Sequence, residues 1–72
     1  MSKKVMDWMI WVVDIVSDSL YNGDKTVGYD MLKKYGIFDW YVEHYEVTHS
    51  LGKEYLLNEV QEIIKKGGIA KC

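Results

Sequence analysis

Apolar residues recur every three or four positions along most of the chain, which is the spacing of amphipathic helices. Four segments share this pattern, at about residues 3–21, 27–35, 39–48 and 51–66. Short connections separate them, so neighbouring helices should lie side by side. We find no convincing strand. The pattern therefore predicts an all-α fold, a compact four-helix bundle in a single domain of residues 1–68, with residues 69–72 as a flexible tail.

Small and polar residues mark the expected helix ends. Stops containing glycine follow three of the segments, at Asn22–Gly23, Gly36 and Gly67–Gly68. We expect the hydroxyls of Thr26 and Ser50 to cap the second and fourth helices.

Two of these helix starts resemble each other. Residues 26–32 and 50–56 both read as hydroxyl, apolar residue, glycine, any residue, acid, bulky residue and leucine. We interpret the match as two similar helix starts, in which the early glycine lets another backbone come close.

The first helix carries a wide apolar arc. One stripe contains Val5, Met9, Val12, Val16 and Leu20, flanked by Met6, Ile10 and Val13. Trp11 falls on the polar side of the helix, and Trp8 and Ile15 border that side. An arc this wide predicts that the first helix has a second apolar surface beside its core face, which another part of the protein or a partner must cover. Because Trp and Tyr dominate protein–protein hot spots, our candidate partner-binding residues are Trp8, Trp11, Ile15, Trp40 and Tyr41.

The composition explains why the aromatic residues matter. A chain of 72 residues with one cysteine, Cys72, has no internal disulfide, and no Cys/His grouping has structural-zinc spacing. Three Trp, six Tyr and one Phe are the largest side chains available for a small core. The net charge is −2 and every basic residue is a lysine, which disfavours a nucleic-acid partner.

No catalytic signature is present, and we predict no catalytic residues, no cofactor and no metal site. His44 and His49 are five positions apart and do not share a helical face, so they do not form the zinc pair of i and i+4. For His49 we expect a contact with free backbone groups. The acidic faces of helices one and three are typical of a solvated surface, and they also suit a basic partner.

The N-terminus superficially resembles a signal peptide. However, Asp7 and Asp14 interrupt its apolar run and no small-residue cleavage site follows. The longest apolar stretch, Trp8–Val13, is far shorter than a membrane span requires. We predict a cytoplasmic protein without a membrane segment.

Residues 33–40, KKYGIFDW, and 45–56, YEVTHSLGKEYL, resemble a family of small bacterial domains of unknown function. Its members carry K-Y-G-x-x-D-[YW] and then Y-[DE]-x-x-H-[ST]-x-G-x-x-Y-[LV]. Residues 26–32 fit the usual beginning of the second helix in that family, so the resemblance runs from residue 26 onward, about two-thirds of the chain, and leaves helix one outside the motif. The positions that match are Tyr35, Gly36, Asp39, Tyr45, His49, Gly52 and Tyr55.

The resemblance implies an antitoxin-like or accessory role, since such proteins are often encoded beside toxin-like partners, including ones similar to ADP-ribosyltransferases. It supplies no catalytic residues. Together with the composition, it predicts a non-catalytic module that binds a toxin-like protein. Two alternatives stay open: a helix-turn-helix-like DNA-binding regulator, and a small homo-oligomer that buries the wide face of helix one against a second copy.

Overall fold

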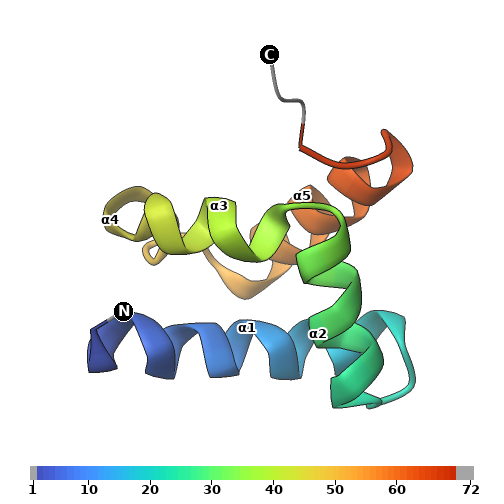
Figure 1. Cartoon of the computed structure of the whole chain (residues 1–72), viewed down its shortest axis with the longest axis horizontal. Helices are drawn as coiled ribbons and strands as arrows, with labels where there is room; N and C mark the ends of the chain where they lie inside the picture. Colours follow the sequence, from blue (N-terminus) through green and yellow to red (C-terminus); the bar gives the residue numbers. More distant parts are fainter. Residues whose placement is uncertain (1, 70–72) are drawn as a thin grey trace.

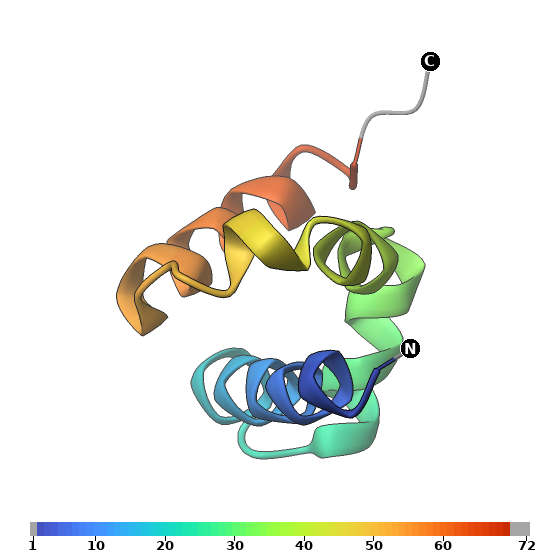
Figure 2. The same cartoon turned by 90° about the vertical axis from the view of Figure 1, so that its left-hand side faces the viewer.

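A computed structural model describes residues 2–69 of the chain. Five helices follow in chain order: α1 (Lys3–Leu20), α2 (Lys25–Lys34), α3 (Ile37–Glu43), α4 (Tyr45–Thr48) and α5 (Lys53–Lys65). In Figure 1 and Figure 2, α1 forms one side of the molecule, α3 and α5 lie opposite it, and α2 joins the two sides at one end. No residue from 2 to 69 lies in a strand, and the predicted all-α fold is confirmed.

The core is built from one face of each long helix. Its buried apolar members are Met9, Val12, Ile15, Val16, Leu32, Ile37, Tyr41, Leu56 and Val60. The predicted stripe of α1 is confirmed, because its middle residues are buried and its two end residues, Val5 and Leu20, pack against the core. Each fully buried side chain of this size contributes about 1.5 to 3 kcal/mol through removal of apolar surface from water.

The predicted third helix, 39–48, is wrong in two respects, because it starts earlier at Ile37 and divides at His44. The backbone N–H of His44 and its ring Nδ1 both donate to the carbonyl of Trp40. Thr48 Oγ1 in turn donates to the carbonyl of His44 at 2.9 Å. Side chains that bond to nearby backbone compete with the regular helical ladder, which accounts for a break between α3 and α4.

Both predicted hydroxyl caps are wrong. The side chain of Asp24, two residues before Thr26, accepts from the N–H of Val27 and caps α2. At α5 the capping position belongs to Gly52, without a side-chain bond, while the hydroxyl of Ser50 donates back to the carbonyl of Val47. An aspartate carboxylate caps at least as well as a threonine hydroxyl and also suits the positive end of the helix dipole.

The glycine stops are confirmed. Gly36 has φ 75° between α2 and α3, and Gly67 and Gly68 after α5 have φ 95° and 118°. This last turn returns the chain to the core, since the N–H of Ile69 donates to the carbonyl of Tyr35 at 2.9 Å and its side chain packs on the core. Ile69, the first residue of the predicted tail, therefore has a backbone bond and a side-chain contact with the rest of the fold. The rest of the predicted tail, 70–72, lies outside the described residues.

Helices α1 and α2 approach each other closely where Ser17 faces Gly28. Both residues are buried. A Cβ placed on Gly28 would lie 1.9 Å from Ser17 Oγ and 3.0 Å from Ser17 Cβ, so only glycine fits without movement. The hydroxyl of Ser17 has no hydrogen-bond partner among the described residues. The serine side chain is small enough to allow the close approach of the two helices.

We predict that Gly28→Ala lowers the free energy of unfolding by about 1 to 3 kcal/mol, because overpacking at Ser17 outweighs the better helix propensity of alanine. Urea unfolding followed by circular dichroism measures the change. Adding Ser17→Ala removes the nearest atom and should recover part of the loss.

Gly52 is the matched control, because it occupies the equivalent position in the sequence echo but a Cβ added to it would meet no atom within 4 Å. Gly52→Ala should change the free energy of unfolding by less than about 0.5 kcal/mol, because reduced freedom of the unfolded chain offsets a weaker cap. Equal losses at both glycines would show that the close approach to Ser17 does not matter.

Candidate functional site

An open groove of about 630 Å³ lies between α1, α2 and the start of α3. Its lining residues are Met6, Met9, Ile10, Val13, Asp14, Lys25, Thr26, Tyr29 and Phe38. We call this surface the α1–α2 groove. Its volume falls within the range of about 300 to 1,000 Å³ that is typical of ligand pockets, which are likewise mostly apolar with a few polar groups.

The α1 wall of the groove is an apolar stripe, of which the first two residues are exposed. Met6, Ile10 and Val13 stand at positions i, i+4 and i+7, on the flank of α1 beside its core stripe. Met6 is 50% exposed and Ile10 is 55% exposed, although both are large apolar side chains. Two neighbouring large apolar side chains are thus open to solvent on this flank of α1.

The opposite wall is aromatic. Tyr29 of α2 is 43% exposed and meets Phe38 of α3 edge to face, with ring centroids 5.3 Å apart. The ammonium of Lys33 lies 5.3 Å from the centroid of the Phe38 ring and 3.1 Å from the carboxylate of Asp39. These contacts hold the two rings in place, so the wall is formed before any ligand arrives.

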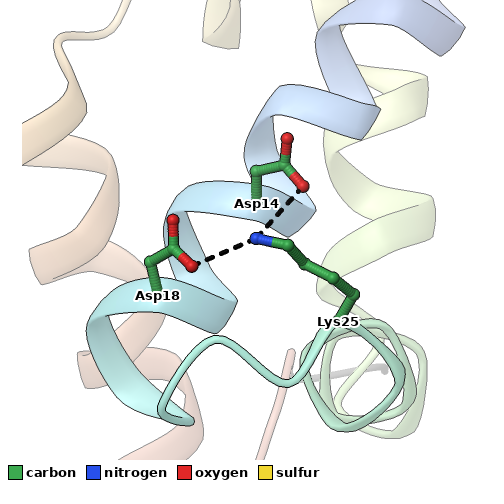
Figure 3. A network of polar contacts seen from close by, with 3 residues as sticks. All are labelled: Asp14, Asp18 and Lys25. Atoms are coloured by element: carbon green, nitrogen blue, oxygen red, sulfur yellow. Dashed lines mark hydrogen bonds and ion pairs between the residues drawn. The ribbon is translucent and has the colours of Figure 1, made fainter.

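A cluster of three charges lies at the rim of the groove, and two of its members, Asp14 and Lys25, line the groove. Lys25 Nζ lies 3.1 Å from Asp18 Oδ1 and 3.4 Å from Asp14 Oδ1, and so ties the start of α2 to α1 (Figure 3). The hydrogen bond to Asp18 raises the pKa of Lys25 above its usual value. Because all three side chains are at least half exposed, water screens the pairs and they add little stability. Two carboxylates and one ammonium leave one net negative charge at this rim.

The five residues predicted to bind a partner do not form one surface. Ile15 and Tyr41 are buried in the core, so a partner cannot contact their side chains in this structure. Trp8 and Trp40 are partly buried against the core. Trp11 is 37% exposed, in agreement with its predicted place on the polar side of α1.

Trp8 of α1 and the α3 residues Trp40 and Tyr41 instead form one aromatic cluster. The ring of Tyr41 lies 5.9 Å from that of Trp8 and 5.6 Å from that of Trp40, measured between centroids. Its hydroxyl donates to Glu59 Oε1 of α5 at 2.7 Å. Such tilted ring pairs add about 0.5 to 1.5 kcal/mol each beyond the burial of area. The cluster links α1, α3 and α5, which is a structural role.

The first three residues of the predicted family motif have structural explanations. Tyr35 caps α2 and its carbonyl accepts from Ile69. Gly36 takes the left-handed conformation that joins α2 to α3. Asp39 stands in the first turn of α3 and pairs with Lys33.

The other four motif residues lie around α4 and the start of α5. His49 Nδ1 donates to the carbonyl of Tyr45, and the two rings stack with centroids 4.5 Å apart. This carbonyl also accepts from the backbone N–H of His49, so it is not one of the free backbone groups that the prediction named. Tyr45 also meets Trp8 edge to face. Gly52 begins α5, and the side chain of Tyr55 is exposed. The motif residues therefore lie mainly at helix junctions, and none of them lines the groove.

Potential metal ligands do not gather in the part of the chain that the structure describes. Within residues 2–69, no three histidine, cysteine, aspartate or glutamate side chains lie closely enough together to hold a metal ion. No helix in the same range has the length and apolar character needed to cross a membrane.

A family model described as a protein of unknown function, DUF3791, matches residues 7–67 of the 72. The chain belongs to the DUF3791 family. No curated protein and no solved structure matched the chain. The matched range includes most of α1, so the family extends beyond the motif to helix one. Every residue that lines the groove, except Met6, lies inside the DUF3791 match.

Sequence reasoning looked for the second surface of α1 on a different flank from the one where the groove opens. The two tryptophans suggested the side of Trp8 and Trp11, whereas the groove opens on the side of Met6, Ile10 and Val13. The apolar spacing of these three residues was visible in the sequence. What the sequence does not show is that α2 and Phe38 stand beyond them and leave them uncovered.

We predict that the free energy of unfolding falls above pH about 10, by up to about 1.4 kcal/mol per pH unit from Tyr41. Burial, followed by the hydrogen bond to the Glu59 carboxylate, raises the pKa of Tyr41 well above its ordinary value. The folded chain then keeps this proton at a pH where the unfolded chain loses it, so the stabilisation is complete below pH about 10 and is lost above it.

Urea unfolding of the wild type and of Tyr41→Phe between about pH 8 and 11 measures this effect. The variant should lose about 1 kcal/mol at the lower pH, through the missing hydrogen bond, and should decline less steeply at the higher pH. Parallel curves for the two proteins would rule out Tyr41 as the source.

Proposed function

We propose that this DUF3791 chain is a non-catalytic module that binds another protein through the α1–α2 groove. The exposed side chains of Met6, Ile10 and Tyr29 around one apolar depression carry the proposal. A methionine in such a wall favours binding, because its flexible thioether side chain adapts to the shape of a partner. The aromatic wall and the charged rim then fix the position of what is bound.

The partner that we propose is a toxin-like protein, which gives the module an antitoxin-like or accessory role in the cytoplasm. The resemblance of residues 26–56 to domains encoded beside toxin-like proteins supports this partner. The acidic residues at the rim of the groove also support it, because they would steer a basic surface toward the groove. A module that only binds a partner over an apolar groove requires no catalytic group.

We predict that Ile10→Asp weakens binding to the toxin-like product of the adjacent gene by about 30-fold or more, which corresponds to the loss of a hot-spot side chain of about 2 kcal/mol. A carboxylate at this position would have to lose its water against an apolar partner surface. Isothermal titration of the purified proteins measures the change, and co-purification checks it.

Val47→Asp is the matched control, because Val47 is also a large apolar residue, 68% exposed, but lies on α4 outside the groove. It should change the affinity by less than about threefold. Circular dichroism confirms that both variants are folded. The proposal fails if the folded partner gives no binding heat and does not co-purify, or if the two variants weaken binding equally.

A further inference from the structure

We infer that the α1–α2 groove accepts a short amphipathic helix with apolar side chains at i, i+4 and i+7 and with lysine or arginine along one flank. The inference rests on the proposed function and names the partner surface that it requires. Three observations carry it: the backbone around the groove, the spacing of the apolar residues along the α1 wall and the charge along α1.

The backbone around the groove selects a helix over an extended segment. The lining comes from α1, α2 and α3, and their central peptide groups are already bonded within each helix. An extended peptide in the groove would bury N–H and C=O groups against apolar side chains without partners, and each such group costs about 1 to 3 kcal/mol. A helix bonds its own backbone and presents only side chains.

The spacing of the apolar residues along the α1 wall suits a helix of two turns. Met6, Ile10 and Val13 follow one flank of α1 over about 10 Å, the length of seven helical residues. Helices pack by placing such a row into the gaps between the equivalent rows of another helix. Apolar residues at i, i+4 and i+7 of a partner therefore match the α1 wall, in the recognised mode of a helix that binds in a groove.

The charge along α1 favours a partner helix with a basic flank. Beyond the apolar stripe, Asp7 and Asp14 stand on the same edge of α1, and Asp14 shares the single ammonium of Lys25 with Asp18. Within the described residues Asp7 has no ion pair, and Lys3, in the first turn, is the only lysine of α1 on this edge. The edge is therefore net negative and complements lysine or arginine.

The same charge disfavours a second copy of the chain as the occupant. In a two-fold dimer each copy contributes the same patch. The acidic edge of one α1 would then lie beside the acidic edge of the other, and like charges in contact oppose association.

Selection from a displayed library tests the inference. The probes are peptides of about 15 residues, designed as helices, with apolar residues fixed at i, i+4 and i+7 and all flanking positions randomised among charged and polar residues. The bait is the full chain, and Ile10→Asp removes peptides that bind elsewhere. We expect enriched peptides to carry more lysine and arginine than acid on one flank.

Two variants of the chain test the charge directly on the best peptide. Asp7→Asn combined with Asp14→Asn should weaken binding about tenfold, and the wild-type affinity should fall by a similar factor between low salt and about 0.5 M salt. Glu62→Gln is the matched control, because Glu62 is an exposed acid on α5 away from the groove, and it should leave the affinity unchanged.

Three results would overturn the inference: no peptide that depends on Ile10, enriched peptides without a basic excess, or sedimentation that shows a dimer abolished by Ile10→Asp. The proposed function is judged separately, by titration with the toxin-like protein. If that protein binds through Ile10 while the library result is negative, the proposed binding function is supported. Only the inference of a helical, basic partner surface is then rejected. If a basic helix binds while the toxin-like protein does not, the toxin-like partner is rejected.

Discussion

The contact between Ser17 and Gly28 determines how α2 crosses α1, and both the core and the groove depend on that crossing. Without a Cβ on Gly28, the backbone of α2 lies directly against Ser17. Consecutive helical residues point about 100° apart. The placement that buries Gly28, and Leu32 one turn later, therefore turns the intervening Tyr29 outward to the aromatic wall. A larger residue at Gly28 would push α2 away and alter both surfaces together.

Aromatic packing takes the place of the disulfides or metal that stabilise many chains of this length. Tyr41 is the centre of that packing, since its ring contacts Trp8 and Trp40 and its hydroxyl reaches Glu59. A buried tyrosine hydroxyl needs such a partner, because an unpaired polar group in the core is destabilising. The residues that looked suited to binding a partner are thus largely used to join α1, α3 and α5.

The groove follows from the small size of the chain. A chain of 72 residues forms a single small core, and the apolar arc of α1 is wider than that core covers. α2 crosses one end of α1 and Phe38 stands opposite, so Met6 and Ile10 remain open between them. The walls are helices that also pack on the core, so their backbone is already regular and a partner need not order it.

Much of the fold can be predicted from local pattern. The helical periods, the buried stripe of α1 and the glycine stop at Gly36 depend on residues near one another in the chain, and the sequence by itself determined them. The division at His44 and the cap by Asp24 depend on which of several nearby polar groups bonds to the backbone, and pattern alone does not choose between them. Only the tertiary structure decided which flank of α1 stays open. Tyr41 of α3 and Trp8 of α1 are covered because α1, α3 and α5 pack together around them. Ile10 is left exposed because α2 crosses α1 further along, at Ser17.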